Sequence, residues 1–447
     1  MNQIWPSPSR SGRGVLVAAA SIAVLVAPGL AGAETYDLAT CTSLALRNTL
    51  TAEQARTNLQ SAEAGVTGAR SGFLPRLSVS GSWTKPETTT EQIGGEFIVF
   101  DDSYWSGGAN ASWTLFDGLG TWNSWKSARY GRDAAEEAYR SARQDVVYQT
   151  ESRYVDVLEK QELLEVARRA KELSQEQLKK TEAMRELGAA TLADVYKAQV
   201  DHQNNLLSEL QAERDLRVAK ASLATYMGLD ALAEIDLVAD SPGQDTQSTL
   251  ADSIERAMEV NPDLRAARSR ELSGKHDVRA ARSNNIPSLS LFASGSYFNT
   301  ELSSFDDDHT DYSYGVRMSW TVFDGLLTKS NIRRSQATLA NSRRQLEDTE
   351  RQVRFLVSQS WYDLEVARRA IEVAQVAVQS SEEDHRLAQE RFRIGEGTIL
   401  DVIDARVNLT RTSSELVSAR YTARLAAAAL RNAIGELEPP AEANATP

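Results

Sequence analysis

The chain has 447 residues, a formal net charge of −13 and a pI near 5.1, so it lacks the surplus of Lys and Arg that a nucleic-acid surface needs. Only 7% of its residues are aromatic, its mean hydropathy is −0.40, and long segments are rich in Ala, Glu, Gln and Arg. This composition argues against thick globular cores and favours long helices with narrow apolar seams.

The N-terminal segment has the pattern of a secretory signal peptide. Arg10 and Arg13 precede an apolar run at 15–30, and the small residues at 31–33 suit cleavage. We therefore expect residues 1–33 to be a signal peptide and the rest of the chain to lie outside the cytoplasm. No other segment approaches ~18 consecutive apolar residues, so no transmembrane helix is expected in the mature chain.

Alternation of apolar and small polar residues predicts strands after Pro75 and Pro287. Segments 76–83 and 288–297 and the return strand 314–322 place apolar residues on one face and Ser, Thr, Gly or Arg on the other. Strands of roughly ten residues suit a tilted crossing of a membrane barrel with a watery interior. The alternative is a soluble hairpin with one half-buried face.

Aromatic residues lie near both ends of these strands, in the manner of interfacial girdles. Those expected at one membrane interface are Trp113, Phe116, Trp320 and Phe323. Those toward the other end are Tyr104, Trp105, Tyr297, Phe298 and Tyr312. The loops between the strands are acidic, and Asp306-Asp307-Asp308-His309 lacks the ligand spacing of a calcium loop, so we expect solvated loops without a metal.

Two long segments repeat one pattern in constant register. Residues 113–118 and 320–325 read Trp-Thr-Leu-Phe-Asp-Gly and Trp-Thr-Val-Phe-Asp-Gly, and each opens a proline-free segment that closes at Gly228 or Gly435. Both pairs of landmarks are 207 residues apart. We interpret each copy as a strand, a long helix, a tight turn and a returning helix.

The long helix of the first copy is expected from about 119 to 187, on the order of 100 Å at 1.5 Å per residue. The returning helices, 192–227 and 399–434, are about half as long, as are continuous helices predicted at 38–70 and 249–282. Stacked end to end beside the long helix, two short helices would make a cylinder of even height. Coiled-coil seams are predicted at Ala135, Tyr139, Ala142 and Val146; at Val366, Ala370, Val373 and Ala377; and at Val402, Ala405, Leu409, Thr412 and Leu416.

The sequence contains no catalytic constellation. The four histidines, His202, His276, His309 and His385, are scattered, and no phosphate loop, dinucleotide fingerprint or nucleophile elbow is present. We expect no enzyme activity, no cofactor and no metal site. The single cysteine, Cys41, is expected to be buried, with pairing between chains as the lesser alternative.

The two turns between long and returning helices share Gly, Thr and Asp-Val. Gly188 and Gly395 suit the left-handed C-terminal cap, whereas Thr191 and Thr398 suit the next N-cap, with Asp194 and Asp401 at its third position. A docking role at these turns stays open beside the capping role. Asp401 and Asp404 lie on one helical face with no cationic neighbour in sequence, so in a symmetric assembly they would ring an opening.

Together, the signal peptide, the duplicated strand-and-helix unit, Phe-Asp-Gly at both junctions and the Gly-x-x-Thr-x-x-Asp-Val turns resemble the TolC family of outer-membrane efflux proteins over essentially the whole mature chain. The resemblance implies a homotrimer in which four strands per chain close a barrel of twelve. It also implies a periplasmic adaptor, an inner-membrane transporter and outer-membrane lipid as partners.

The resemblance assigns roles to the tips. Adaptor docking would involve Gly188, Thr191, Leu192, Gly395, Thr398 and Ile399. The periplasmic entrance would be constricted by Asp401 and Asp404, with Asp194 on the other tip. Relatives close this entrance with an aromatic and an arginine, but this chain has Phe392 and Gly397 there, so the arginine of that latch is missing.

The predicted fold class is an α+β membrane protein, a long coiled-coil helical barrel joined to a transmembrane β-barrel that trimerisation closes. Its segments are a signal peptide (1–33), a periplasmic helix (34–74), a first β-hairpin (75–116), a first helical hairpin (117–228), an equatorial connection (229–248), a second periplasmic helix (249–286), a second β-hairpin (287–324), a second helical hairpin (325–435) and a flexible tail (436–447). The predicted function is an exit duct of a tripartite efflux or type I secretion system in the outer membrane. The alternative is a periplasmic or secreted coiled-coil scaffold. The cargo is not identified.

Overall fold

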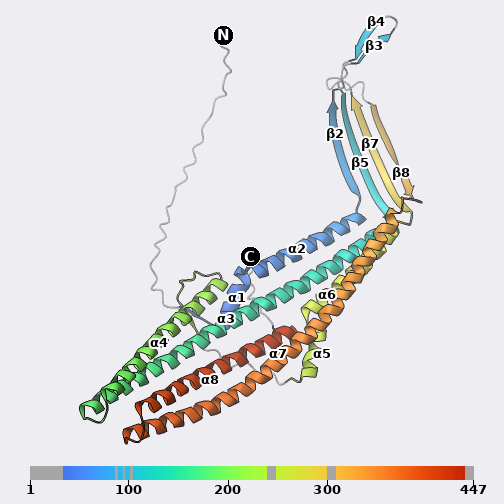
Figure 1. Ribbon diagram of the computed structural model, residues 1–447. Coiled ribbons are helices and arrows are strands. Elements are labelled where there is room, and N and C mark those ends of the chain that lie inside the picture. Colours follow the sequence, from blue (N-terminus) through green and yellow to red (C-terminus); the bar gives the residue numbers. More distant parts are fainter. Residues whose placement is uncertain are drawn as a thin grey trace, which may run out of the picture.

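The computed structural model describes residues 34–85, 89–93, 96–100, 104–238, 248–299 and 309–437. A sheet lies at one end of an elongated protomer, and long helices extend from it to two tips at the other end (Figure 1). The predicted signal peptide, the Asp306-Asp307-Asp308 loop and most of the C-terminal tail lie outside the described residues. Within the described ranges, no helix combines the length and the hydropathy of a membrane span.

Four antiparallel strands form the main sheet, as predicted, in the order β2-β5-β7-β8. Their bounds are β2 (Arg76–Thr84), β5 (Tyr104–Phe116), β7 (Ser288–Asn299) and β8 (His309–Ser319). Beyond the β2–β5 end, β3 (Thr89–Ile93) pairs with β4 (Glu96–Phe100). Part of the segment that was predicted only as an acidic loop therefore forms a second hairpin.

The strand register separates the sheet into an apolar and a polar face. One row of paired residues across the four strands consists of Leu77, Ala111, Ala293 and Tyr314. The adjacent row, on the opposite face because side chains alternate, consists of Ser78, Asn110, Ser294 and Ser313. The apolar face is uncovered, since Leu77 is 77% and Tyr314 is 87% exposed. A soluble hairpin would half-bury this face, so the exposure favours lipid.

The two long helices are present as predicted, with 67 residues each. They are α3 (Gly120–Glu186) and α7 (Leu327–Arg393), and the returning helices are α4 (Leu192–Tyr226) and α8 (Ile399–Ile434). The shorter elements are α1 (Leu38–Asn48), α2 (Leu50–Arg70), η1 (Ser71–Phe73), α5 (Leu250–Val260) and α6 (Pro262–Ser283). Along α3, α2 packs on the sheet-proximal half and α4 on the tip half (Figure 1). The predicted end-to-end stacking is therefore confirmed, and α6 and α8 repeat it along α7.

The segments 38–70 and 249–282 are broken helices, so the prediction of continuous ones is wrong. Pro262 begins α6 because it lacks the N–H that helix continuation needs, and the Asn261 carboxamide oxygen accepts from the Leu264 N–H at 3.1 Å. The Asn261 amide also donates to the Ala433 carbonyl at 3.0 Å, and Asn48 donates to the Met227 carbonyl at 2.7 Å. Each break thus ties the short helices to the end of a returning helix.

An equatorial core lies between α1, α3 and α4 in the first half of the chain. Strand β1 (Glu34–Tyr36) pairs in parallel with β6 (Ile235–Leu237) in a connection that was predicted without a strand. Cys41, Tyr154 and Leu223 are among the side chains buried beneath it. Cys41 is thus buried as predicted, and burial raises its thiol pKa to about 12.

The first residues after Gly435 belong to the packed structure. Leu437 is buried, and the Glu436 carboxylate lies 2.5 Å from Nε of Arg256 in α5. The prediction that the flexible tail begins at residue 436 is therefore wrong by at least two residues. The apolar Leu437 side chain stabilises this end by leaving water.

We predict opposite effects of two glycine substitutions. Gly435 has a φ of +93°, and an added Cβ would lie 2.7 Å from Pro262 Cδ, so Gly435→Ala should destabilise the chain by about 1–3 kcal/mol. Gly131 lies inside α3 with open space around it, so Gly131→Ala should stabilise the helix by roughly 0.5–1 kcal/mol. Thermal unfolding followed by circular dichroism in detergent checks both, and equal midpoints would contradict the prediction.

Candidate functional site

Both strand-to-helix junctions are built by the same hydrogen bonds. Asp117 accepts from the backbone N–H and the hydroxyl of Thr121, both at 2.6 Å, and Asp324 accepts from Thr328 at 2.7 and 2.5 Å. The Gly-Leu pair that follows each Asp is left-handed, with φ between 67° and 71°. The predicted Phe-Asp-Gly landmarks therefore mark where sheet becomes helix.

The tryptophans predicted at the membrane interface clamp these junctions. The Trp113 indole donates to the Phe73 carbonyl at 2.9 Å, and Trp320 donates to the Asn285 carbonyl at 3.2 Å. Both rings, with those of Phe116 and Phe323, are exposed on the protomer. Amphipathic rings at this level suit an interface between lipid and water.

The two copies differ in where their return strands end. Strand β5 continues to Phe116, whereas β8 ends at Ser319, so the predicted strand through residue 322 is wrong there. The physical reason lies in pairing. Strand β5 has β2 on one side and β7 on the other, but β8 is an edge strand whose register with β7 ends at Ser288.

At the far end of the strands, only part of the predicted girdle lies on the apolar face. Trp105 and Tyr297 share the face of Ala109 and Ala111 by register, as does Tyr312. Tyr104 and Phe298 lie on the polar face, with ring centroids 4.9 Å apart. The girdle prediction is therefore wrong for these two residues, because alternation turns them away from lipid.

The predicted capping at both tips is confirmed. Asp194 accepts from the Thr191 N–H at 3.0 Å and Asp401 from the Thr398 N–H at 2.8 Å, and each threonine hydroxyl accepts from its aspartate N–H in return. Gly188 and Gly395 are left-handed, with φ of 78° and 81°. Hydrogen bonds from Thr191 and Thr398 lower the pKa of Asp194 and Asp401 respectively.

The apolar side chains at the tips differ from those that the repeat suggested. Leu192 is half exposed, whereas its counterpart Ile399 is only 1% exposed and supports the turn from inside instead of presenting a docking surface. The most exposed apolar residues, which the sequence reasoning did not select, are Leu187 at 85% and Ile394 at 60%. Their signal was an apolar residue directly before each capping glycine.

The tip aspartates have a cationic neighbour that the sequence did not reveal. The Arg391 guanidinium on α7 adds to the hydrogen bonds from Thr398 in lowering the pKa of Asp401. Asp404 lies one turn further along α8, exposed and without an ion pair among the described residues. Phe392 is half-buried near the end of α7. Both carboxylates are exposed, but Asp401 is engaged by Thr398, whereas Asp404 has no such hydrogen bond among the described residues.

A buried ion pair between the two helical hairpins was missed by sequence reasoning. Arg406 on α8 is 2% exposed, and it donates to the Asp201 carboxylate and, at 3.0 Å, to the Asn205 carboxamide oxygen, both on α4. Burial raises the pKa of Asp201 and lowers that of Arg406, while their mutual attraction opposes both shifts. No local motif could have found a pair separated by about two hundred residues.

A histidine on α7 lies near this pair. His385 is buried, its Nε2 lies 3.0 Å from Gln389 Nε2, and its Nδ1 has no hydrogen-bond partner among the described residues. Burial, and then the charge of Arg406, lower the pKa of His385. One turn earlier, Ser381 is hydrogen-bonded to Thr412 of α8 at 2.7 Å. The two helices of the second hairpin therefore contact each other through polar side chains in their tip half.

Exposed apolar residues form a stripe along α4 and another along α7, the two helices at the lateral edges of the protomer. On α4 they are Tyr196, Val200, Leu207, Leu210 and Val218, and on α7 Phe355, Tyr362, Val366, Val373 and Val376. The buried seam of α7 consists instead of Val353, Val357, Leu364, Ala367 and Ala374. The predicted seam through Val366 and Val373 is thus wrong for packing within the protomer. By contrast, Val402, Ala405 and Thr412 of the predicted α8 seam are buried.

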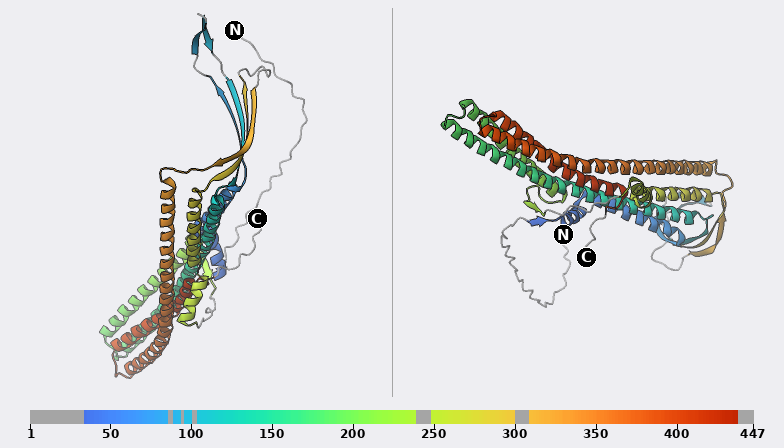
Figure 2. Two further views of the ribbon diagram at one scale, coloured as in Figure 1. Left: turned by 90° about the vertical axis from the view of Figure 1, so that its right-hand side faces the viewer. Right: turned by 90° about the horizontal axis from the view of Figure 1, so that it is seen from below.

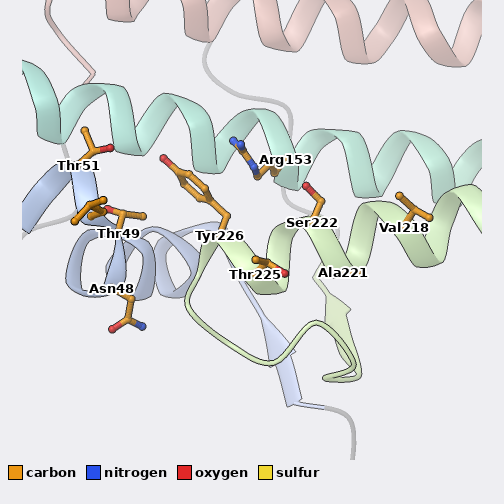
Figure 3. Close-up of a pocket in the computed structure, with 10 residues that line it drawn as sticks. Asn48, Thr49, Thr51, Arg153, Val218, Ala221, Ser222, Thr225 and Tyr226 are labelled. Atoms are coloured by element: carbon orange, nitrogen blue, oxygen red, sulfur yellow. The ribbon is translucent and has the colours of Figure 1, made fainter.

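A pocket of about 700 Å³ lies between α4 and the break that separates α1 from α2 (Figure 3). Val218, Ala221 and Thr225 of α4 line it, on the helical face that carries the stripe. Arg153 of α3 places its guanidinium carbon 4.0 Å from the centroid of the Tyr226 ring. No group of three or more potential metal ligands occurs in the described part of the chain.

An exposed apolar sheet joined through capped turns to paired helical hairpins defines the class, an outer-membrane protein with a helical extension into the periplasm. The family described as "Outer membrane efflux protein" matches residues 41–229 and 253–436. The chain therefore belongs to this family, the TolC-like outer-membrane factors.

Known members of the class align over most of the chain. Outer membrane protein TolC of Vibrio cholerae is 26% identical over 378 residues, which cover 83% of this chain and 84% of the relative. Outer membrane efflux protein BepC of Brucella suis is 23% identical over 393 residues, covering 88% and 84%. The Campylobacter jejuni CmeC outer membrane channel shares the fold, with a TM-score of 0.78 at 18% identity over 91% of this chain and 87% of that one. The general role in outer-membrane efflux or secretion follows.

We predict that the buried pair is costly to break from one side. Arg406→Met leaves the Asp201 carboxylate buried without its partner and should destabilise the chain by about 3–5 kcal/mol, whereas Arg406→Met with Asp201→Leu should recover most of that loss. The exposed pair of Arg411 and Glu415, 2.8 Å apart, is the control, and Arg411→Met should cost about 0–1 kcal/mol. Denaturant unfolding and hydrogen exchange of α4 and α8 measure the difference. Equal effects at Arg406 and Arg411 would refute it.

Proposed function

We propose that three copies of the chain close into one continuous duct, which passively conducts solute from an inner-membrane pump to the exterior. The observation that carries the proposal is the four-stranded sheet, whose apolar face is uncovered and whose edges, β2 and β8, lack a partner within the described sheet. A sheet in lipid needs every backbone group paired, and the smallest membrane barrels have about eight strands. Three copies supply twelve.

The helical edges support the same assembly. Val218 lies 26 residues beyond the first residue of α4, and Val366 lies 27 residues before the last residue of α7, so these two stripe residues are at the same level above the tips. Tyr362 lies 31 residues before the end of α7, level with Ser222, which lines the equatorial pocket. We infer that α7 of one copy packs against α4 of the next, with Tyr362 directed to that pocket.

The tips are the proposed docking surface for a periplasmic adaptor. Leu187 and Ile394 are the most exposed apolar side chains there, and Leu192 and Leu400 are half exposed beside them. Exposed apolar residues on otherwise polar turns are typical of a protein contact. The adaptor would link the chain to its transporter, and the proposal assigns the chain itself no catalytic step.

The proposed entrance gate is Asp404, with Asp401 beside it. In a trimer, each position recurs three times around the axis, and a ring of carboxylates favours cations. Asp401 also caps α8, so its carboxylate stays charged but already accepts hydrogen bonds from Thr398. Asp404 carries the freer charge.

We predict that Asp404→Asn reduces cation selectivity and changes single-channel conductance in planar bilayers, because the ring loses its charges while the cap of α8 stays intact. Asp363→Asn, on the exposed surface of α7 far from the tip, is the matched control and should leave both quantities unchanged. If Asp404→Asn conducts as the unmodified chain does, Asp404 does not line the entrance.

We predict that Val218→Cys combined with Val366→Cys yields covalently linked trimers on oxidation, read on a denaturing gel without reductant. Cys41 is buried and should not compete. Val218→Cys with Val376→Cys is the control, since residue 376 lies about 15 Å nearer the tip at 1.5 Å per residue and should cross-link poorly. A chain that remains monomeric and soluble without detergent would contradict the duct.

A further inference from the structure

An aromatic and cationic cluster lies where the first long helix leaves the sheet. The Phe73 ring contacts Trp122 and Trp125 edge-on, with centroids 6.4 and 6.3 Å away, and the two indoles are 5.1 Å apart. Lys126 Nζ lies 5.5 and 5.3 Å from the two indole centroids, and the Arg129 guanidinium lies 5.9 Å from that of Trp125. Trp122 is nevertheless 46% exposed.

This cluster continues the membrane-facing surface of the sheet. Trp113, on the apolar face, donates its indole N–H to the Phe73 carbonyl, and the Phe73 ring then reaches the first turns of α3. Exposed Leu74 and Leu119 lie on either side of the junction. Going away from the sheet along α3, the order is therefore apolar residues, indoles and then cations.

Positive charge gathers here although the whole chain is acidic. Residues 118–132 contain three cations and no acidic residue, in a chain of net charge −13. Lys126 and Arg129 contact no carboxylate among the described residues. His276 of α6 lies beside this segment, with its Nδ1 3.0 Å from the Asn123 carboxamide oxygen. Burial lowers the pKa of His276, and the positive charges of Arg279 and Lys126 lower it further.

We propose that Trp122, Trp125, Lys126 and Arg129 bind the phosphate of an anionic phospholipid from the periplasmic leaflet of the outer membrane. Indoles favour the head-group level, and Lys and Arg side chains reach from there to lipid phosphates. The carboxylate-free cations and the continuity with the apolar face select a lipid over a peptide.

The second copy of the repeat lacks the aromatic half of the site. At the 207-residue offset, Lys329 replaces Trp122 and Ile332 replaces Trp125, although Lys329 and Arg333 keep this helix basic. The site therefore occurs once per chain, and the second copy is a matched control for charge without indoles.

The test is native mass spectrometry of the full chain in detergent with dioleoyl-phosphatidylglycerol or dioleoyl-phosphatidylcholine. The unmodified chain should retain phosphatidylglycerol preferentially, and Lys126→Gln with Arg129→Gln should lower that preference by roughly fivefold per cation. Lys329→Gln with Arg333→Gln should change it little, and Lys126→Arg with Arg129→Lys should keep it.

Three outcomes would overturn the site. One is an unchanged preference after Lys126→Gln with Arg129→Gln, and another is an equal loss in the Lys329 and Arg333 variant, which would mean non-specific charge. The third is displacement of phosphatidylglycerol by millimolar inorganic phosphate, which would mean a site for free anions. None of these outcomes bears on the proposed conductance, which the bilayer recordings test separately.

Discussion

The structure depends on one constraint, that a sheet in lipid cannot leave backbone hydrogen-bonding groups unpaired. Four strands with an uncovered apolar face do not satisfy that constraint alone, so the protomer is built as one segment of a wall (Figure 2). The helical region follows the same plan. Two 67-residue helices set its height, shorter helices stack beside them, and apolar stripes remain exposed on α4 and α7.

At two junctions, the same kinds of contact connect a strand of the sheet to a long helix. Asp117 and Asp324 each cap a long helix through one threonine, and Trp113 and Trp320 each hold the segment before the preceding strand. The same kinds of hydrogen bond therefore begin both long helices, although β5 continues to Phe116 and β8 ends at Ser319. Between the hairpins, by contrast, the buried contact of Arg406 has no repeat-related twin, because the residue at the equivalent position of the first copy is the uncharged Gln199.

At the tips, some residues hold the turns and others are exposed to partners or solute. Asp194 and Asp401 hold the turns by reciprocal hydrogen bonds, so their charges are partly committed to the fold. Exposed Leu187, Ile394 and Asp404 contribute little to the protomer's own packing and are available to partners or solute. The two copies therefore share the capped turn, but they differ in the exposure of Leu192 and Ile399 and in the additional carboxylate of Asp404.

The sequence by itself determined the repeat, the strand and long-helix periods, the capped turns and the family resemblance, because these depend on local spacing and short-range hydrogen bonds. Only the tertiary structure decided which seam of α7 is buried, since Val366 and Val357 both recur at heptad spacing and differ in what lies opposite. Burial of Ile399, pairing of Arg406 with Asp201 and the early end of β8 also depend on neighbours distant in sequence. Local patterns carry no record of such neighbours.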